Sequence, residues 1–212
     1  MRKLLLLFAI LLVCAPAGFA QSDYSNWEFV IGYAHERANN GADRLDIKGR
    51  SISSTGALSS VDLVSKRVPY NGVNGEVVAN VRHNIGLVAD FTVTFANTNF
   101  VDNLTGRNFN AKLWRYTALF GPRFNWRNSS PFIPYAHALF GATRYHVSFR
   151  NNDFTTPNTD ATAFAMALGA GLDIRASNRI DVRAGQIDYL PVFFSQKRED
   201  GFRFSAGVKI KD

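Results

Sequence analysis

The chain has 212 residues, of which 46% are hydrophobic, 13% aromatic and 19% charged, with 24 basic residues, 17 acidic residues and one cysteine. This apolar content excludes a disordered chain, and a single cysteine excludes both an internal disulfide framework and a cysteine-rich zinc site. The length suits one domain, and no apolar run after residue 20 approaches the roughly 20 residues that a membrane-spanning helix requires.

Residues 1–20 have the three parts of a secretory signal peptide. A basic start is followed by an apolar stretch over residues 4–13 and by small residues before a cut after Ala20. We predict that residues 1–20 are a cleaved signal peptide and that residues 21–212 form the mature domain. An exported chain meets little nucleic acid, so we expect no nucleic-acid partner despite the basic charge balance. Cys14 leaves with the leader, and Val13 before it does not suit a lipoprotein signal.

Along the rest of the chain, apolar and polar residues alternate with the period of two that is typical of β-strands. Eight such segments lie near residues 27–34, 73–81, 87–95, 114–124, 131–145, 162–175, 180–189 and 201–211. The connections between them are long at 37–71, 97–110, 146–161 and 190–200, and short at 82–84, 125–130 and 176–179. Long connections at one rim and tight turns at the other predict an all-β fold, an eight-stranded antiparallel up-and-down transmembrane β-barrel with both termini on the periplasmic side.

The two faces of these strands differ in a way that favours a membrane barrel over a soluble lipocalin-type barrel, whose apolar face points inward. Glycines gather on the polar face, where a narrow lumen needs room for large neighbours: Gly32, Gly86, Gly121, Gly141, Gly169, Gly171, Gly185 and Gly207. Charges on that face balance at six against six: Glu28, Glu36, Glu76, Asp90, Asp173 and Asp181 against Arg115, Arg123, Arg175, Arg183, Arg203 and Lys209. A desolvated lumen requires such pairing, so we expect a plugged polar interior.

The apolar face carries charges only near strand ends, at Lys112 and Arg144, where they can reach lipid headgroups. Aromatic residues form two girdles of the kind seen in membrane barrels: Trp27, Phe124, Trp126 and Phe132 at the rim of the short turns, and Tyr33, Phe95, Trp114, Tyr116 and Tyr145 at the other rim. One segment breaks the alternation. A bulge near Gly185 would turn Ile187 and Tyr189 outward; alternatively, the strand has left the membrane at that height.

The strand segments resemble those of small OmpA-like outer-membrane β-barrel domain proteins, including opacity-type members. The matching stretches are FVIGY (29–33), IGLVADF (85–91), LFGPRF (119–124), PFIPYAHALFG (131–141), AFAMALGAGLD (163–173), QIDYL (186–190) and FSAGV (204–208). The resemblance implies the barrel fold, the outer membrane of a Gram-negative-type bacterium and contact with the barrel insertion machinery, and it implies no shared catalytic residue. The chain departs from the family by lacking a peptidoglycan-binding domain and by ending in Lys211-Asp212 instead of an aromatic residue.

One pair of residues suggests chemistry. His146 and Ser148 are two apart on a strand, and a histidine can activate a serine hydroxyl as a general base. A similar His-x-Ser pair occurs in an eight-stranded outer-membrane lipid A deacylase, so a lipid-modifying enzyme is one alternative function. However, no acid is evident to orient the imidazole, and the pair falls where a strand gives way to a long connection. We therefore predict a chance pair and no enzymatic activity.

The remaining candidates favour structural roles. His137 falls on the polar face and is expected to be a hydrogen-bonded lumen residue. The four histidines have no metal-ligand spacing, and Gly-x-Gly at 169–171 opens no helix, so we expect no metal and no cofactor. A narrow pore is a second alternative, although eight strands leave room only for side chains.

The connection 37–71 is net basic, with Arg37, Arg44, Lys48, Arg50, Lys66 and Arg67 against Asp43, Asp46 and Asp62. It could contact anionic headgroups or a polyanionic sugar, or simply be a solvated loop. We expect a monomer that contacts outer-membrane lipid and lipopolysaccharide and has a structural or surface-interaction role.

Overall fold

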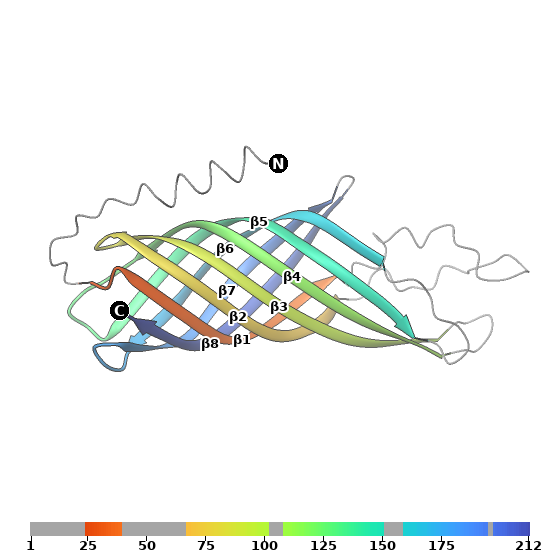
Figure 1. Cartoon of the computed structure of the whole chain (residues 1–212), viewed down its shortest axis with the longest axis horizontal. Helices are drawn as coiled ribbons and strands as arrows, with labels where there is room; N and C mark the ends of the chain where they lie inside the picture. The colour runs from red at the N-terminus through yellow and green to blue at the C-terminus, as the bar shows by residue number, and fades with distance from the viewer. Residues whose placement is uncertain (1–23, 40–66, 102–107, 151–158, 195–196) are drawn as a thin grey trace, which may run out of the picture.

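The computed structural model describes residues 24–39, 67–101, 108–150, 159–194 and 197–212. Eight strands run in chain order: β1 (Trp27–Asn39), β2 (Arg67–Arg82), β3 (Ile85–Val101), β4 (Asn108–Asn125), β5 (Phe132–Arg150), β6 (Thr159–Arg175), β7 (Ile180–Phe194) and β8 (Lys197–Lys211). Each pairs antiparallel with its neighbours, and β1 pairs with β8, so the sheet closes into a barrel of tilted strands (Figure 1). The predicted fold is confirmed. No helix in the described residues is long and apolar enough to cross a membrane.

Both ends of the described chain lie at one rim of the barrel, together with the three short turns (Figure 1). The backbone N–H of Asp212 donates to the carbonyl oxygen of Trp27 at 3.2 Å, and the Ser25 hydroxyl donates to the Asp212 carboxylate. We call this end the terminal rim and the opposite end the far rim.

The strands reach further toward the far rim than their hydrophobic pattern indicates. β7 ends at Phe194 and β8 begins at Lys197, so the long connection predicted at 190–200 is wrong. Similarly, β5 continues to Arg150 and β6 starts at Thr159. Backbone pairing continues past the apolar band because main-chain hydrogen bonds form whether or not apolar and polar side chains alternate along the strand. Most of the basic connection, residues 40–66, lies outside the described residues, as does the predicted signal peptide.

The apolar face is the outer surface of the barrel. Phe91, Phe120 and Phe164 are 59%, 49% and 49% exposed, whereas Asp90, Arg115 and Arg183 are buried in the lumen. A soluble barrel with an apolar interior is therefore excluded. The bulge in β7 is also confirmed, because the register with β8 shifts between Arg183 and Gln186. It turns Ile187 outward and leaves Gln186 and Asp188 buried.

Two predicted placements are wrong. Tyr145 is buried in the lumen and does not belong to the aromatic girdle of the far rim, because it keeps the inward phase of Tyr135 in the same strand. Arg175 is exposed because β6 ends there, at the terminal rim. Alternation gives the face of a residue, while its height along the barrel decides whether it is covered.

Two glycines of β6 leave space for large side chains in the lumen, as the sequence predicts. A Cβ on Gly169 would collide with the carboxylate of Asp188 and lie 2.7 Å from His137 Nε2, and one on Gly171 would collide with the Tyr135 hydroxyl group. Gly185, by contrast, lies in the β7 bulge, and a Cβ there would meet the ring of outward-facing Phe204. Small residues on β6 thus let large polar side chains of β5 and β7 cross the lumen.

Candidate functional site

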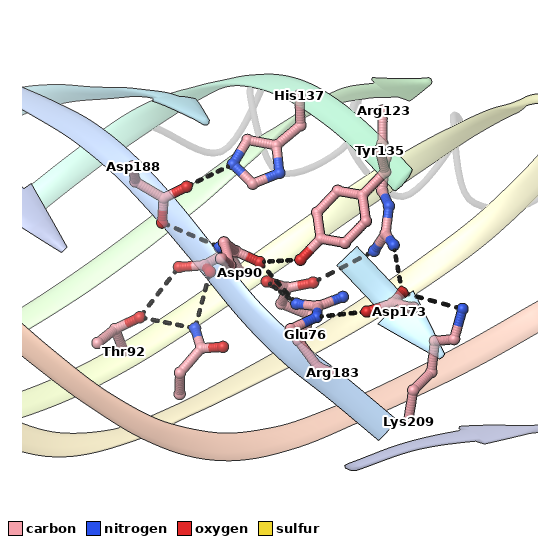
Figure 2. A network of polar contacts seen from close by, with 12 residues as sticks. Glu76, Asp90, Thr92, Arg123, Tyr135, His137, Asp173, Arg183, Asp188 and Lys209 are labelled. Atoms are coloured by element: carbon pink, nitrogen blue, oxygen red, sulfur yellow. Dashed lines mark hydrogen bonds and ion pairs between the residues drawn. The ribbon is translucent and has the colours of Figure 1, made fainter. Parts of the chain in front are cut away.

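The lumen holds a continuous network of buried ionic side chains (Figure 2). Close to the terminal rim, Lys209 Nζ lies 2.9 Å from Asp181, 3.1 Å from Asp173 and 3.2 Å from Glu28. These four side chains come from β8, β7, β6 and β1, so one ammonium group joins strands from across the seam of the barrel. Arg127, in the turn between β4 and β5, adds a contact of 2.6 Å to Glu28 at the mouth.

Further inside the barrel, two arginines stack on one tyrosine (Figure 2). The guanidinium of Arg123 lies 3.6 Å from the centroid of the Tyr135 ring, and that of Arg183 lies 4.8 Å from it. Arg183 also pairs with Glu76 at 2.6 Å and with Asp173 at 3.0 Å. These side chains link strands β2, β4, β5, β6 and β7.

The next layer toward the far rim centres on Arg203. Its Nε donates to Asp188 at 2.7 Å, and its Nη1 donates to Asp90 at 2.8 Å. His137 joins the layer through Nε2, which lies 2.9 Å from Asp188. His137 is thus hydrogen-bonded in the lumen. Beyond this layer, Arg115 pairs with Glu36 and donates to Thr143 at 3.1 Å.

The predicted charge balance of six against six does not hold among the described residues. Eight carboxylates and five basic side chains are buried in the barrel. The difference arises because Arg175 is exposed while Asp188 and Glu199, which were not counted, are buried. Cations at the terminal rim compensate in part, since Arg127 reaches Glu28 and Lys211 reaches Asp181 at 2.6 Å.

A second polar cluster lies on the outer surface, near the far rim. His146 Nδ1 is 2.6 Å from Asp160 Oδ1, and His146 Nε2 is 3.2 Å from Ser148 Oγ. The other carboxylate oxygen of Asp160 accepts a hydrogen bond from Arg144 at 2.8 Å. Serine, histidine and aspartate are therefore linked in one chain of hydrogen bonds, in the order that nucleophilic catalysis uses.

The strand register explains why these three side chains meet. His146 of β5 lies directly opposite Asp160 of β6, and Ser148 is two residues further along β5 on the same face. Tyr145 on the same strand is buried in the lumen, so the alternation directs His146 and Ser148 outward. On the other side of β5, Trp114 lies opposite His146 and Lys112 lies opposite Ser148.

Asp160 is the residue that sequence reasoning missed. It was assigned to a long connection between strands, whereas it is the second residue of β6. The alternation could have located it. Thr162 faces outward, so extending the strand back by two residues places Asp160 on the outer face as well. The hydrophobic pattern gives no help there because the strand has left the apolar band.

Known proteins share this architecture. The family described as outer membrane protein beta-barrel domain matches residues 5–209, and no curated protein matches the chain significantly. Among solved structures, Ail, the attachment invasion locus protein of Yersinia pestis, in complex with the heparin analogue sucrose octasulfate, is 17% identical with a TM-score of 0.51, over 88% of this chain and 99% of its own. Neisserial surface protein A is 12% identical with a TM-score of 0.53, over 90% and 100%. OprG of Pseudomonas aeruginosa is 11% identical with a TM-score of 0.53, over 89% and 96%. The likeness to these small outer-membrane barrels is one of fold.

Proposed function

This chain belongs to the outer membrane protein beta-barrel domain family, and on that premise we propose that it is a non-conducting barrel with a role at the cell surface. Family membership implies the outer membrane of a Gram-negative-type bacterium. We further propose that residues 1–20 direct export, that residues 21–212 form the barrel domain, and that the protein is a monomer delivered by the barrel insertion machinery.

The proposal of a closed lumen is supported mainly by the ion pairs that cross the barrel at several heights. Lys209, Arg183 and Arg203 each pair with carboxylates from more than one strand, and all three are buried. A permeating ion would have to displace these partners, and an eight-stranded barrel has no spare width beside them. The network serves the fold, and the narrow-pore alternative is disfavoured.

A conductance measurement tests the closed lumen. The full chain, reconstituted in planar lipid bilayers, is expected to give no discrete current steps beyond those of protein-free membranes prepared with the same detergent. Steps whose size grows with salt concentration would contradict the proposal. The folded state of each sample is checked by electrophoresis, where an unheated barrel migrates faster than a boiled one.

We propose that the far rim faces the cell exterior, since an even strand count leaves both termini at the periplasmic rim. The basic connection between β1 and β2 is then exposed to lipopolysaccharide and to polyanionic sugars. The Ail structure contains a heparin analogue, which is a polyanion of this kind. The proposed contact is electrostatic and rests on the net basic sequence of residues 37–71.

Binding to heparin tests that contact. Replacing Arg44, Lys48 and Arg50 together with glutamine is expected to weaken binding of the refolded full chain roughly tenfold at low salt, and less at high salt, because exposed charges contribute only modestly and are screened. The matched control replaces Arg82, Arg175 and Arg179, three arginines exposed at the terminal rim, with glutamine. Equal losses in both variants would indicate attraction by net charge alone and would overturn a specific role for the connection.

A further inference from the structure

The polar cluster on the outer surface of β5 and β6 is separate from the ionic network of the lumen. We propose that Ser148, His146 and Asp160 form a triad that hydrolyses an ester-linked acyl chain of an anionic lipid in the surrounding membrane. This activity goes beyond the proposed surface role and is an alternative to the chance pair that the sequence predicts. It rests on the proposed orientation only for the choice of leaflet.

The hydrogen bonds assign a role to each side chain. In the neutral tautomer of His146 that donates Nδ1–H to Asp160 at 2.6 Å, Nε2 can accept from the Ser148 hydroxyl at 3.2 Å. A link of this length between nucleophile and base is common before substrate binds. Asp160 is itself fixed, since its second oxygen is held by Arg144. Ser148 and His146 are the catalytic residues, and Asp160 is a positioning residue.

The height of the triad suits a lipid ester. His146 lies level with Trp114, whose ring stacks on that of Tyr116 with centroids 6.3 Å apart, within the aromatic girdle of the far rim. Such girdles mark the boundary between acyl chains and headgroups. Ester bonds of membrane lipids lie at this boundary. The side chain of His146 is 30% exposed and that of Asp160 is 43% exposed, so the surrounding lipid can reach the cluster without entering the barrel.

Two cations beside the triad indicate an anionic substrate. Lys112 lies opposite Ser148 on β4, and Arg144 lies two residues before His146 on β5. Both side chains are exposed on the outer surface. Arg144 already pairs with Asp160, and Lys112 places a second cation beside Ser148, so positive charge gathers around the proposed nucleophile. A lipid phosphate held between them would bring its acyl esters to Ser148.

The reaction is an acyl transfer to water. Ser148 Oγ attacks the ester carbonyl carbon while His146 Nε2 takes the hydroxyl proton. The bond from that carbon to the alcohol oxygen then breaks, and the proton on His146 passes to the leaving alcohol. Water, activated by His146 in the same way, cleaves the serine ester, releases a fatty acid and restores the hydroxyl group. Asp160 stabilises the imidazolium that forms in both steps.

Two measurements on the full refolded chain in detergent micelles test the triad. First, a long-chain alkyl fluorophosphonate is expected to label Ser148, as identified by mass spectrometry of the peptide. Second, fatty-acid release is measured from phosphatidylglycerol and, in a separate arm, from lipopolysaccharide. The two arms distinguish the source of the anionic lipid.

The variants separate catalysis from folding. Ser148→Ala is expected to lower fatty-acid release at least a thousandfold, and Asp160→Asn roughly a hundredfold in kcat with KM unchanged. Asp160→Glu is expected to recover part of the loss. Thr162→Ala removes a neighbouring outward hydroxyl on β6 and is expected to leave the rate unchanged. Each variant is first shown to be folded by its faster migration without heating.

The outcomes are decisive without reference to the lumen or the orientation, because micelles expose the whole outer surface. Absence of label at Ser148 in the folded protein overturns the triad, as does fatty-acid release that persists in Ser148→Ala. Labelling at Ser148 without release from either lipid overturns the assigned substrate class. Failure of the conductance or heparin predictions would leave these results unaffected.

Discussion

Replacing Arg203 with methionine is expected to lower the free energy of unfolding of the barrel by about 3–5 kcal/mol, the range for breaking a buried ion pair by removing one partner. Arg203 is buried and pairs with Asp90 at 2.8 Å and with Asp188 at 2.7 Å. Methionine fills much of the same volume without charge, so both carboxylates lose their shared cation. The measurement is urea unfolding of the reconstituted protein, followed by tryptophan fluorescence.

A control and a rescue make this result specific. Arg175→Met removes an arginine that is in phase with the lumen but exposed at the terminal rim, and it is expected to change stability by less than about 0.5 kcal/mol. If Arg203→Met folds too poorly to measure, the double variant Arg203→Met with Asp90→Asn removes one of the stranded charges and is expected to recover stability. Equal effects of Arg203→Met and Arg175→Met would show that the lumen is solvated.

Arg175 and Asp188 show which features of the barrel the alternating sequence pattern can predict and which it cannot. Strict alternation correctly gave the faces of the residues along most strands, because the pleat fixes them. It failed for Asp188 until the bulge at Gly185 was taken into account, since one extra residue inverts the phase. It also failed to give height: Arg175 has the inward phase, but no strand covers it.

The site on the outer surface illustrates a different limit. His146 and Ser148 were recognised by residue type and spacing, but Asp160 is twelve residues after Ser148 and on another strand. Which residue lies opposite His146 depends on how far β5 and β6 extend before the chain turns. That length is set by backbone hydrogen bonding beyond the apolar band, where side chains carry no periodic signal. Local pattern therefore identified two members of the proposed triad, and only tertiary register identified the third, Asp160.

The lumen and the outer site impose opposite requirements on the same strands. Arg115 on β4 is buried and paired inside the barrel, while Trp114 beside it is exposed and level with the proposed triad. Inward side chains hold the cylinder rigid through ion pairs that cross it. A rigid wall is what an outward triad on two strands requires, because its geometry depends on the register of β5 with β6. The proposed closed lumen and the proposed outer triad are thus compatible within one fold.

Phe120→Arg is expected to destabilise the barrel by about 2–4 kcal/mol, because a cation on the lipid face is most costly at the midplane of the bilayer. Phe120 is 49% exposed on β4, between the girdle residues Trp114 and Phe124. The matched control is Phe132→Arg at the terminal rim, where the same charge reaches headgroups and is expected to cost about 0–1 kcal/mol. Both are measured by urea unfolding in lipid vesicles. A cost at Phe120 no greater than that at Phe132 would mean that the aromatic outer surface does not lie in hydrocarbon.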